Sequence, residues 1–137
     1  MINSYNTSTQ TLAVDAPVVF TLDRVKTGCT VTHTTGSATF TLNRPGYYFI
    51  TFNADATTAD AAGNVTLGLQ QNSVAVPGAE ATQYAAAAVN ISNLAFSALI
   101  QVRPSCCAVS NATSLTVVNT GVEATVSNAN IVITKLA

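Results

Sequence analysis

The stretch that decides the fold covers residues 43–55 and reads NRPGYYFITFNAD. It opens on the turn Arg44-Pro45-Gly46, because proline restricts φ and glycine accepts a positive φ. Residues 47–52 then form an uncharged run of aromatic and β-branched side chains, which suit a pleated and packed surface. A run of this length between turn signals predicts a central strand that is buried on much of both faces.

Short segments of alternating polarity surround this strand, and turn residues separate them every 8–12 residues or so. Further strands are predicted at residues 18–22, 29–35, 38–42, 64–71, 74–76, 94–102, 114–118, 122–127 and 130–136. Turns at Asn72-Ser73 and at residues 119–121 are expected to close hairpins. Residues 79–89, AEATQYAAAAV, leave two interpretations open, since alanine favours a short helix but the neighbouring segments favour a strand of small residues. The pattern of about ten strands predicts an all-β, antiparallel sandwich or barrel.

The size and composition are those of one neutral domain. The chain has 137 residues and a mass of 14.1 kDa, and its net charge is −1. Charged residues make up 8% of the chain, against about 25% in typical soluble domains. A neutral surface rich in hydroxyl and amide groups suits an extracellular, cell-surface or virion protein. The basic residues form no cluster, so the sequence gives no support for nucleic-acid binding.

The N-terminal residues 1–13 are polar and rich in Asn, Ser and Thr. We expect them to form an arm ahead of a head domain at residues 14–137. Met1 is followed by no secretory signal, and no apolar run approaches the ~20 residues needed to span a membrane. We therefore expect no membrane insertion, and a location on a virion, outside the cell or at the cell surface.

Three segments resemble a known family. GSATFTLNRPGYYFITFNA (residues 36–54) resembles the central strands of complement-type globular heads, which belong to the tumour-necrosis-factor-like (TNF-like) jelly rolls. NVTLGLQQNSVAVPGA (64–79) resembles the following hairpin of that family, although its turn is Asn72-Ser73 where Asn-Gly is typical. SNANIVITKLA (127–137) resembles the last strand of bacterial members, including the heads of collagen-like spore-surface glycoproteins. The resemblance covers residues 15–137 and implies a jelly-roll β-sandwich of about ten strands.

The resemblance also implies a homotrimer with an apolar, aromatic interior. Tyr47, Phe49 and Tyr84, with Ala86 and Ala88 in the alanine run, offer more flat apolar surface than one small sandwich needs. We predict that these five residues line the interface between protomers, in a trimer of about 3 × 14.1 ≈ 42 kDa. The alternative is a monomer whose aromatic side chains fill its own core.

Two classes of function remain open on the sequence. The first is a non-enzymatic structural or recognition module, such as a phage fibre head, a capsid decoration protein or a bacterial surface protein. It would dock on a capsid or stalk component and bind host glycan or protein through loop tips at 54–63 and 103–113. Asp55, Thr57, Asp60 and Asn111 are the predicted ligand-facing residues. The second class is a secreted signalling or adhesion ligand of the same fold.

No catalytic motif is present, and no cofactor is implied. His33 is the single histidine, and we expect it at the surface or at an interface. A Ser–His–Asp site has no support from a GxSxG motif or a comparable pattern.

The cysteines Cys29, Cys106 and Cys107 are odd in number, which argues against a disulfide scaffold. Buried thiols are the first expectation, a disulfide the second and a zinc site a distant third. Asp55 and Asp60 flank a loop where calcium is conceivable, although solvated acidic side chains are the favoured interpretation.

Overall fold

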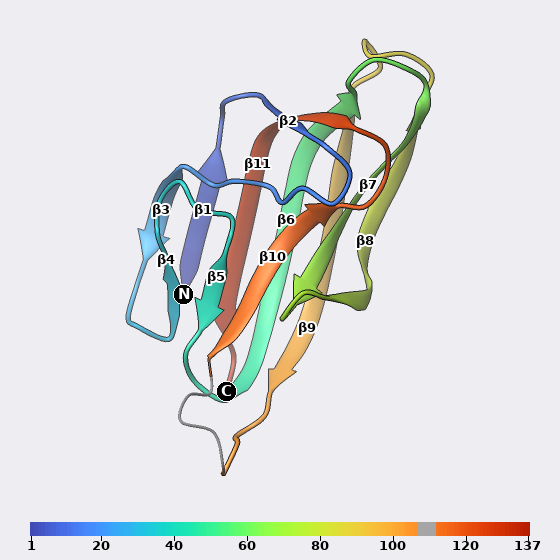
Figure 1. Cartoon of the computed structure of the whole chain (residues 1–137). Helices are drawn as coiled ribbons and strands as arrows, with labels where there is room; N and C mark the ends of the chain where they lie inside the picture. The colour runs from blue at the N-terminus through green and yellow to red at the C-terminus, as the bar shows by residue number, and fades with distance from the viewer. Residues whose placement is uncertain (107–111) are drawn as a thin grey trace.

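The computed structural model describes residues 1–106 and 112–137 and places them in two antiparallel β-sheets that face each other (Figure 1). The described part of the chain contains no helix, and so none that is long and apolar enough to cross a membrane. The strands are β1 (Ile2–Asn6), β2 (Gln10–Leu12), β3 (Leu22–Lys26), β4 (Val31–His33), β5 (Phe40–Leu42), β6 (Gly46–Thr58), β7 (Gly63–Gln71), β8 (Val74–Ala85), β9 (Ser92–Val102), β10 (Thr113–Asn119) and β11 (Ala124–Lys135).

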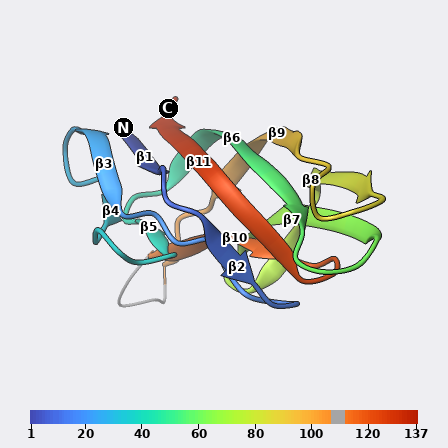
Figure 2. The same cartoon turned by 90° about the horizontal axis from the view of Figure 1, so that it is seen from above.

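The two sheets interleave strands that are distant in sequence. Sheet I has the order β3-β1-β11-β6-β9, with β2 paired to β11, and sheet II has the order β4-β5-β10-β7-β8. Figure 2 shows the same arrangement from above. Strands β10 and β11, which were expected to form a hairpin, belong to different sheets. The predicted all-β, antiparallel sandwich is confirmed, but its connections were not visible in the local turn signals.

Strand β6 alternates between the two faces of sheet I. Tyr48, Ile50 and Phe52 point into the sandwich and are buried, whereas Tyr47 and Phe49 are 46% and 42% exposed. The prediction that this strand is buried on both faces is therefore wrong for the single chain. Sheet II covers one face of β6 only, because side chains alternate along a strand.

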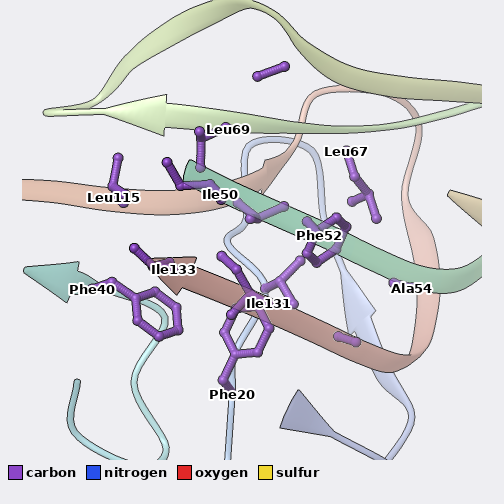
Figure 3. Packing of buried hydrophobic residues seen from close by; sticks show 14 of the residues in the cluster. Phe20, Phe40, Ile50, Phe52, Ala54, Leu67, Leu69, Leu115, Ile131 and Ile133 are labelled. Carbon is purple, nitrogen blue, oxygen red and sulfur yellow. The ribbon is translucent and has the colours of Figure 1, made fainter. Parts of the chain in front are cut away.

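The core lies between the sheets (Figure 3). Sheet I contributes Ile131 and Ile133 from β11 beside the inward side chains of β6, and sheet II contributes Leu67, Leu69 and Leu115. Each of these five is at most 1% exposed. Because full burial of such a side chain contributes about 1.5–3 kcal/mol, this layer is the main source of stability.

Residues 1–13 are part of the sandwich, so the expectation of a polar arm is wrong. Strand β1 pairs with both β11 and β3, and Ile2 is fully buried. The polar side chains are held by hydrogen bonds: Asn3 Nδ2 donates to the backbone oxygen of Ile131 at 3.0 Å. A hydropathy pattern does not show such bonds, since it treats every Asn as a surface residue.

Two strand boundaries also differ from prediction. Val18 and Phe20 are buried as expected for a strand at 18–22, but the ladder of β3 begins only at Leu22. Strand β8 continues through Pro77-Gly78 to Ala85, with a register shift opposite Gly68 in β7. The strand predicted at 74–76 is therefore too short, because an edge strand accepts a proline at a bulge, where no neighbouring strand needs an amide proton.

Candidate self-association surface

The outer face of sheet I carries an apolar patch at one end. Phe49 of β6 lies directly opposite Leu99 of β9, and Tyr47 follows on the same face of β6. Leu99 is 61% exposed, so all three side chains present apolar surface to water. The Gln101 side chain donates a hydrogen bond of 3.1 Å to the Tyr47 hydroxyl, which orients the ring. We call Tyr47, Phe49 and Leu99 the outer apolar patch.

The same face becomes polar further along the strands. Asn3 Nδ2 donates to Asn130 Oδ1 at 2.7 Å, and Asn130 Nδ2 donates in turn to Asn53 Oδ1 at 3.2 Å. This amide ladder crosses β1, β11 and β6. Each bond positions the next amide, so the side chains on this half of the face are held in a defined arrangement.

Asp55 extends the polar half of the face. Its two carboxylate oxygens accept one hydrogen bond each, from Asn93 Nδ2 and Asn128 Nδ2, both at 3.0 Å. The bond from Asn128 and then the bond from Asn93 lower the pKa of Asp55 below its usual 3.8, against a small opposing effect of burial. Asp55 therefore stays ionised, with both oxygens oriented by amide groups on neighbouring strands.

The remaining residues predicted for the trimer interface lie elsewhere. Tyr84 is on β8 in sheet II, opposite Asn64, and is 60% exposed. Ala86 and Ala88 are exposed in the connection that follows β8. This connection leads into β9, and β8 and β9 lie against each other where the two sheets meet at one edge. The predicted set thus divides between the outer apolar patch and the top of the β8–β9 edge (Figure 1).

The predicted ligand-facing residues are not gathered at one loop tip. Asp55 and Thr57 lie within β6, which extends to Thr58, so the expected loop at 54–63 is shorter than predicted. Thr57 is 7% exposed and donates to the backbone oxygen of Ala88 at 3.0 Å, which ties the β8–β9 connection to sheet I. Asp60 is exposed at the β6–β7 turn, and Asn111 lies outside the described residues.

His33 is buried, so the expectation of a surface or interface histidine is wrong. Its Nδ1 lies 2.8 Å from Asp23 Oδ1 and its Nε2 lies 3.0 Å from the backbone oxygen of Ser37. The ring stacks on Phe40, with 4.4 Å between centroids. Because Asp23 belongs to β3 and His33 to β4, this contact joins the open edges of sheets I and II.

Ser4 completes this cluster without forming a nucleophilic triad. Its hydroxyl donates to the same Asp23 oxygen at 2.6 Å, so the carboxylate stands between the serine and His33. A serine nucleophile needs the histidine as its neighbour, with the carboxylate behind the ring. The order found here, serine, aspartate, histidine, stabilises the sheet edge and leaves no activated nucleophile at these three residues.

The cysteines differ from the first expectation as well. Cys29 and Cys106 are both exposed, so the prediction of buried thiols is wrong for these two, and Cys107 lies outside the described residues. Within the described ranges, no three His, Cys, Asp or Glu side chains gather closely enough to hold a metal ion. The oxygens of Asp55, considered for calcium, face amide N–H donors instead.

No model of a known protein family matches the sequence, and no curated protein matches it significantly. Solved structures do match. Murine APRIL in a crystal structure at pH 5.0 has a TM-score of 0.71 and 8% identity, covering 98% of both chains. Eiger TNF from S. frugiperda has a TM-score of 0.71 and 14% identity, covering 99% of this chain and 92% of its own. The vertex protein P5 of PRD1 has a TM-score of 0.60 and 18% identity, covering 99% of this chain and 96% of its own.

At these identities the likeness shows the fold, which is a TNF-like jelly roll. The fold implied by the segments at 36–54, 64–79 and 127–137 is thereby confirmed. Sequence reasoning missed two features of the surface. Leu99 was assigned only to the strand at 94–102. Because side chains alternate along a strand, Leu99 must point away from the core when Ile100 points into it, and this was a usable signal. The amide ladder had no signal in the sequence, because it depends on which strands become neighbours.

Proposed function

We propose that this chain is a homotrimeric, non-enzymatic structural or recognition module, located on a virion or at a cell surface. The observation that carries the proposal is the outer apolar patch on the outer face of a TNF-like sheet. Phe49 and Leu99 form a direct cross-strand pair, and Tyr47 extends it. A contiguous apolar patch on a small soluble domain marks an interaction surface, whereas scattered single residues do not.

A closed ring of three copies accounts for both exposed apolar regions. Leu99 of the outer apolar patch lies on β9, next to β6, which carries the rest of the patch. The exposed Tyr84, Val89 and Ile91 lie on β8 and in the β8–β9 connection, near the opposite end of the same edge. Packing this edge against a neighbour around an axis parallel to the strands covers both ends at once. Cyclic symmetry then leaves no copy with an uncovered edge. The 8% of charged residues fits a chain that hides its side surface in partners.

The match to PRD1 vertex protein P5, which covers 99% of this chain, supports a virion role. The module would then stand on a capsid or stalk component and recognise a host glycan or protein. The matches to APRIL and Eiger TNF support the alternative, a secreted signalling or adhesion ligand. Capsid and tail genes beside the coding sequence would decide for the virion role, and their absence there would favour the alternative.

The non-enzymatic part of the proposal rests on how His33, the single histidine, is held. Nε2 of His33 is engaged by the backbone oxygen of Ser37, and Nδ1 by Asp23. Neither ring nitrogen is available to a substrate, and the side chain is fully buried. A hydrolytic activity lost on changing His33 would contradict this part of the proposal.

The molar mass in solution tests the assembly directly. Light scattering after size exclusion, with and without reductant, should give about 42 kDa in both conditions, three times the chain mass of 14.1 kDa. A mass near that of one chain would overturn the proposal. Dissociation by reductant alone would mean that the exposed thiols of Cys29 or Cys106 link the copies covalently, and that the outer apolar patch does not suffice.

A further inference from the structure

A hollow of about 210 Å³ lies on the outer face of sheet I, away from the outer apolar patch. It is lined by side chains of β1, β3 and β11, which lie side by side in Figures 1 and 2. The volume is about seven times the ~30 Å³ that one water molecule occupies in the liquid. The hollow is open to solvent and has room for a ligand of one ring.

Two β-bulges flank strand β1 at this hollow. On one side, β3 shifts register between Val25, opposite Asn3, and Asp23, opposite Ser4, so Arg24 is the extra residue. On the other side, β11 shifts register against β6 between residues 127 and 130, and Asn128 has φ +50°. A bulge re-aims a side chain out of the regular alternation, and a positive φ in a residue other than glycine is strained. Both bulges bring their side chains to the same hollow.

Arg24 brings a positive charge to the hollow. Its guanidinium carbon lies over the Tyr5 ring, 4.7 Å from the ring centroid. Among the described residues, no ion pair or hydrogen bond was found for its side chain, whereas Lys26 and His33 both contact Asp23. A guanidinium carries five N–H donors, keeps its charge and binds a carboxylate through two parallel bonds. The ring restricts the guanidinium and leaves its donors for an external acid.

The rest of the lining is polar but neutral, and it is ordered. Asn128 Nδ2 is engaged by Asp55, which leaves Asn128 Oδ1 as an acceptor beside the hollow. Asn130 is fixed by the amide ladder, and Thr7 adds an exposed hydroxyl. One cation beside several neutral donors and acceptors suits a ligand with one carboxylate and several hydroxyl groups. A phosphate would need more cations or backbone N–H groups than this hollow offers.

We infer that this hollow binds the acidic sugar at the end of a glycan, with the carboxylate on Arg24 and the hydroxyl groups on Asn128 and Thr7. The inference deepens the recognition role proposed above and rests on it. The ionised Asp55 reaches the hollow only through Asn128, whose Nδ2 donates to it at 3.0 Å, and it therefore lies on the β11 side of the hollow, whereas Arg24 lies on β3 on the other side of β1. The outer apolar patch occupies β6 and β9, so a neighbouring copy seated there leaves β1 and β3 accessible.

Saturation-transfer NMR on the assembled protein tests the inference with two sugars that differ only at one carbon. The probes are methyl β-D-glucuronide, which has the carboxylate, and methyl β-D-glucoside, which lacks it. We expect transfer to the glucuronide and about fivefold less to the glucoside, which is the upper end of the range for a solvent-accessible charge pair. Arg24→Gln should remove this preference. Arg44→Gln, the same change at an exposed arginine between β5 and β6, should keep it.

A second variant tests the hydroxyl side of the site. Asn128→Gly keeps the bulge, since glycine accepts φ near +50°, but removes the amide oxygen together with the exposed hydrogen bond that Asn128 Nδ2 donates to Asp55. Transfer to the glucuronide should fall while thermal unfolding stays close to that of the wild type.

Three results would overturn the inference: equal transfer to both sugars, no effect of Arg24→Gln, or transfer only to a short acidic peptide used as a third probe. The same samples are measured by light scattering. A trimer that binds no sugar rejects this site and leaves the proposed assembly standing. A monomer that binds the glucuronide through Arg24 rejects the assembly and leaves the site.

Discussion

The double substitution Phe49→Ser with Leu99→Ser should dissociate the trimer without unfolding the protomer. Full burial of a Phe or Leu side chain contributes about 1.5–3 kcal/mol. The two side chains are 42% and 61% exposed in the single chain. Scaling by these fractions gives about 0.6–1.3 and 0.9–1.8 kcal/mol for burying what remains exposed. The loss is therefore about 1.5–3 kcal/mol per protomer, or about 5–9 kcal/mol for three copies.

A loss of this size changes the trimer dissociation constant by about 10³- to 10⁶-fold, since 1.4 kcal/mol is a factor of ten. The constant has units of concentration squared, so the midpoint protein concentration should rise by the square root of this factor, about 30- to 1,000-fold. Sedimentation equilibrium over a dilution series measures the midpoint, and circular dichroism checks that the strands remain. Leu22→Ser is the matched control, because Leu22 is 48% exposed on β3, at the edge of sheet I that is farthest from β9.

An unchanged midpoint for the double variant would refute the role of the outer apolar patch. A shift of the same size for Leu22→Ser would also refute it, because solubility and not a specific contact would then explain the effect.

Three further predictions concern the sandwich itself, each measured by urea unfolding at fixed protein concentration because assembly and folding are linked. Thr58→Val should stabilise the chain by up to about 1–2 kcal/mol, since the buried Thr58 Oγ1 has no hydrogen-bond partner among the described residues. Thr57→Val should destabilise it by about 1 kcal/mol, because it removes the hydrogen bond to the β8–β9 connection. A change of the free energy of unfolding in the same direction for both variants would contradict this. Asn119→Ala should reduce the free energy of unfolding by about 3 kcal/mol or more, because the buried Asn119 amide donates to the backbone oxygens of residues 12, 13 and 122. A loss under about 1 kcal/mol would show that water takes the place of the Asn119 side chain. Burial raises the pKa of Asp23, but the hydrogen bonds of Ser4 and His33 and the charge of Lys26 together lower it below 3.8. The unfolded chain then binds the proton more tightly, so the free energy of unfolding is retained above about pH 4 and falls as the pH drops through the lower pKa of the folded chain. Asp23→Asn should make the free energy of unfolding less dependent on pH in this acidic range.

Local pattern determined much of the architecture. The alternation in residues 47–52 separates Tyr47 and Phe49 from Tyr48, Ile50 and Phe52, because successive side chains on a strand must point to opposite faces. The turn at Asn72-Ser73 was equally readable, and both residues adopt the positive φ that this tight turn between β7 and β8 requires. Such features depend on neighbours within a few residues, so the sequence alone is sufficient to predict them.

Only the tertiary structure decided which surfaces are covered and which side chains meet. Residues 114–118 and 122–127 carry the signals of a hairpin, yet β10 and β11 enter different sheets because their partners lie elsewhere in the chain. His33 is buried because Asp23 from the opposite sheet edge meets its ring. Arg24 and Asn128 line one hollow because both strands flank β1, although about 100 residues separate them. The physical reason is the same in each case: strand pairing is a non-local choice, made by the whole core, and local sequence pattern does not encode it.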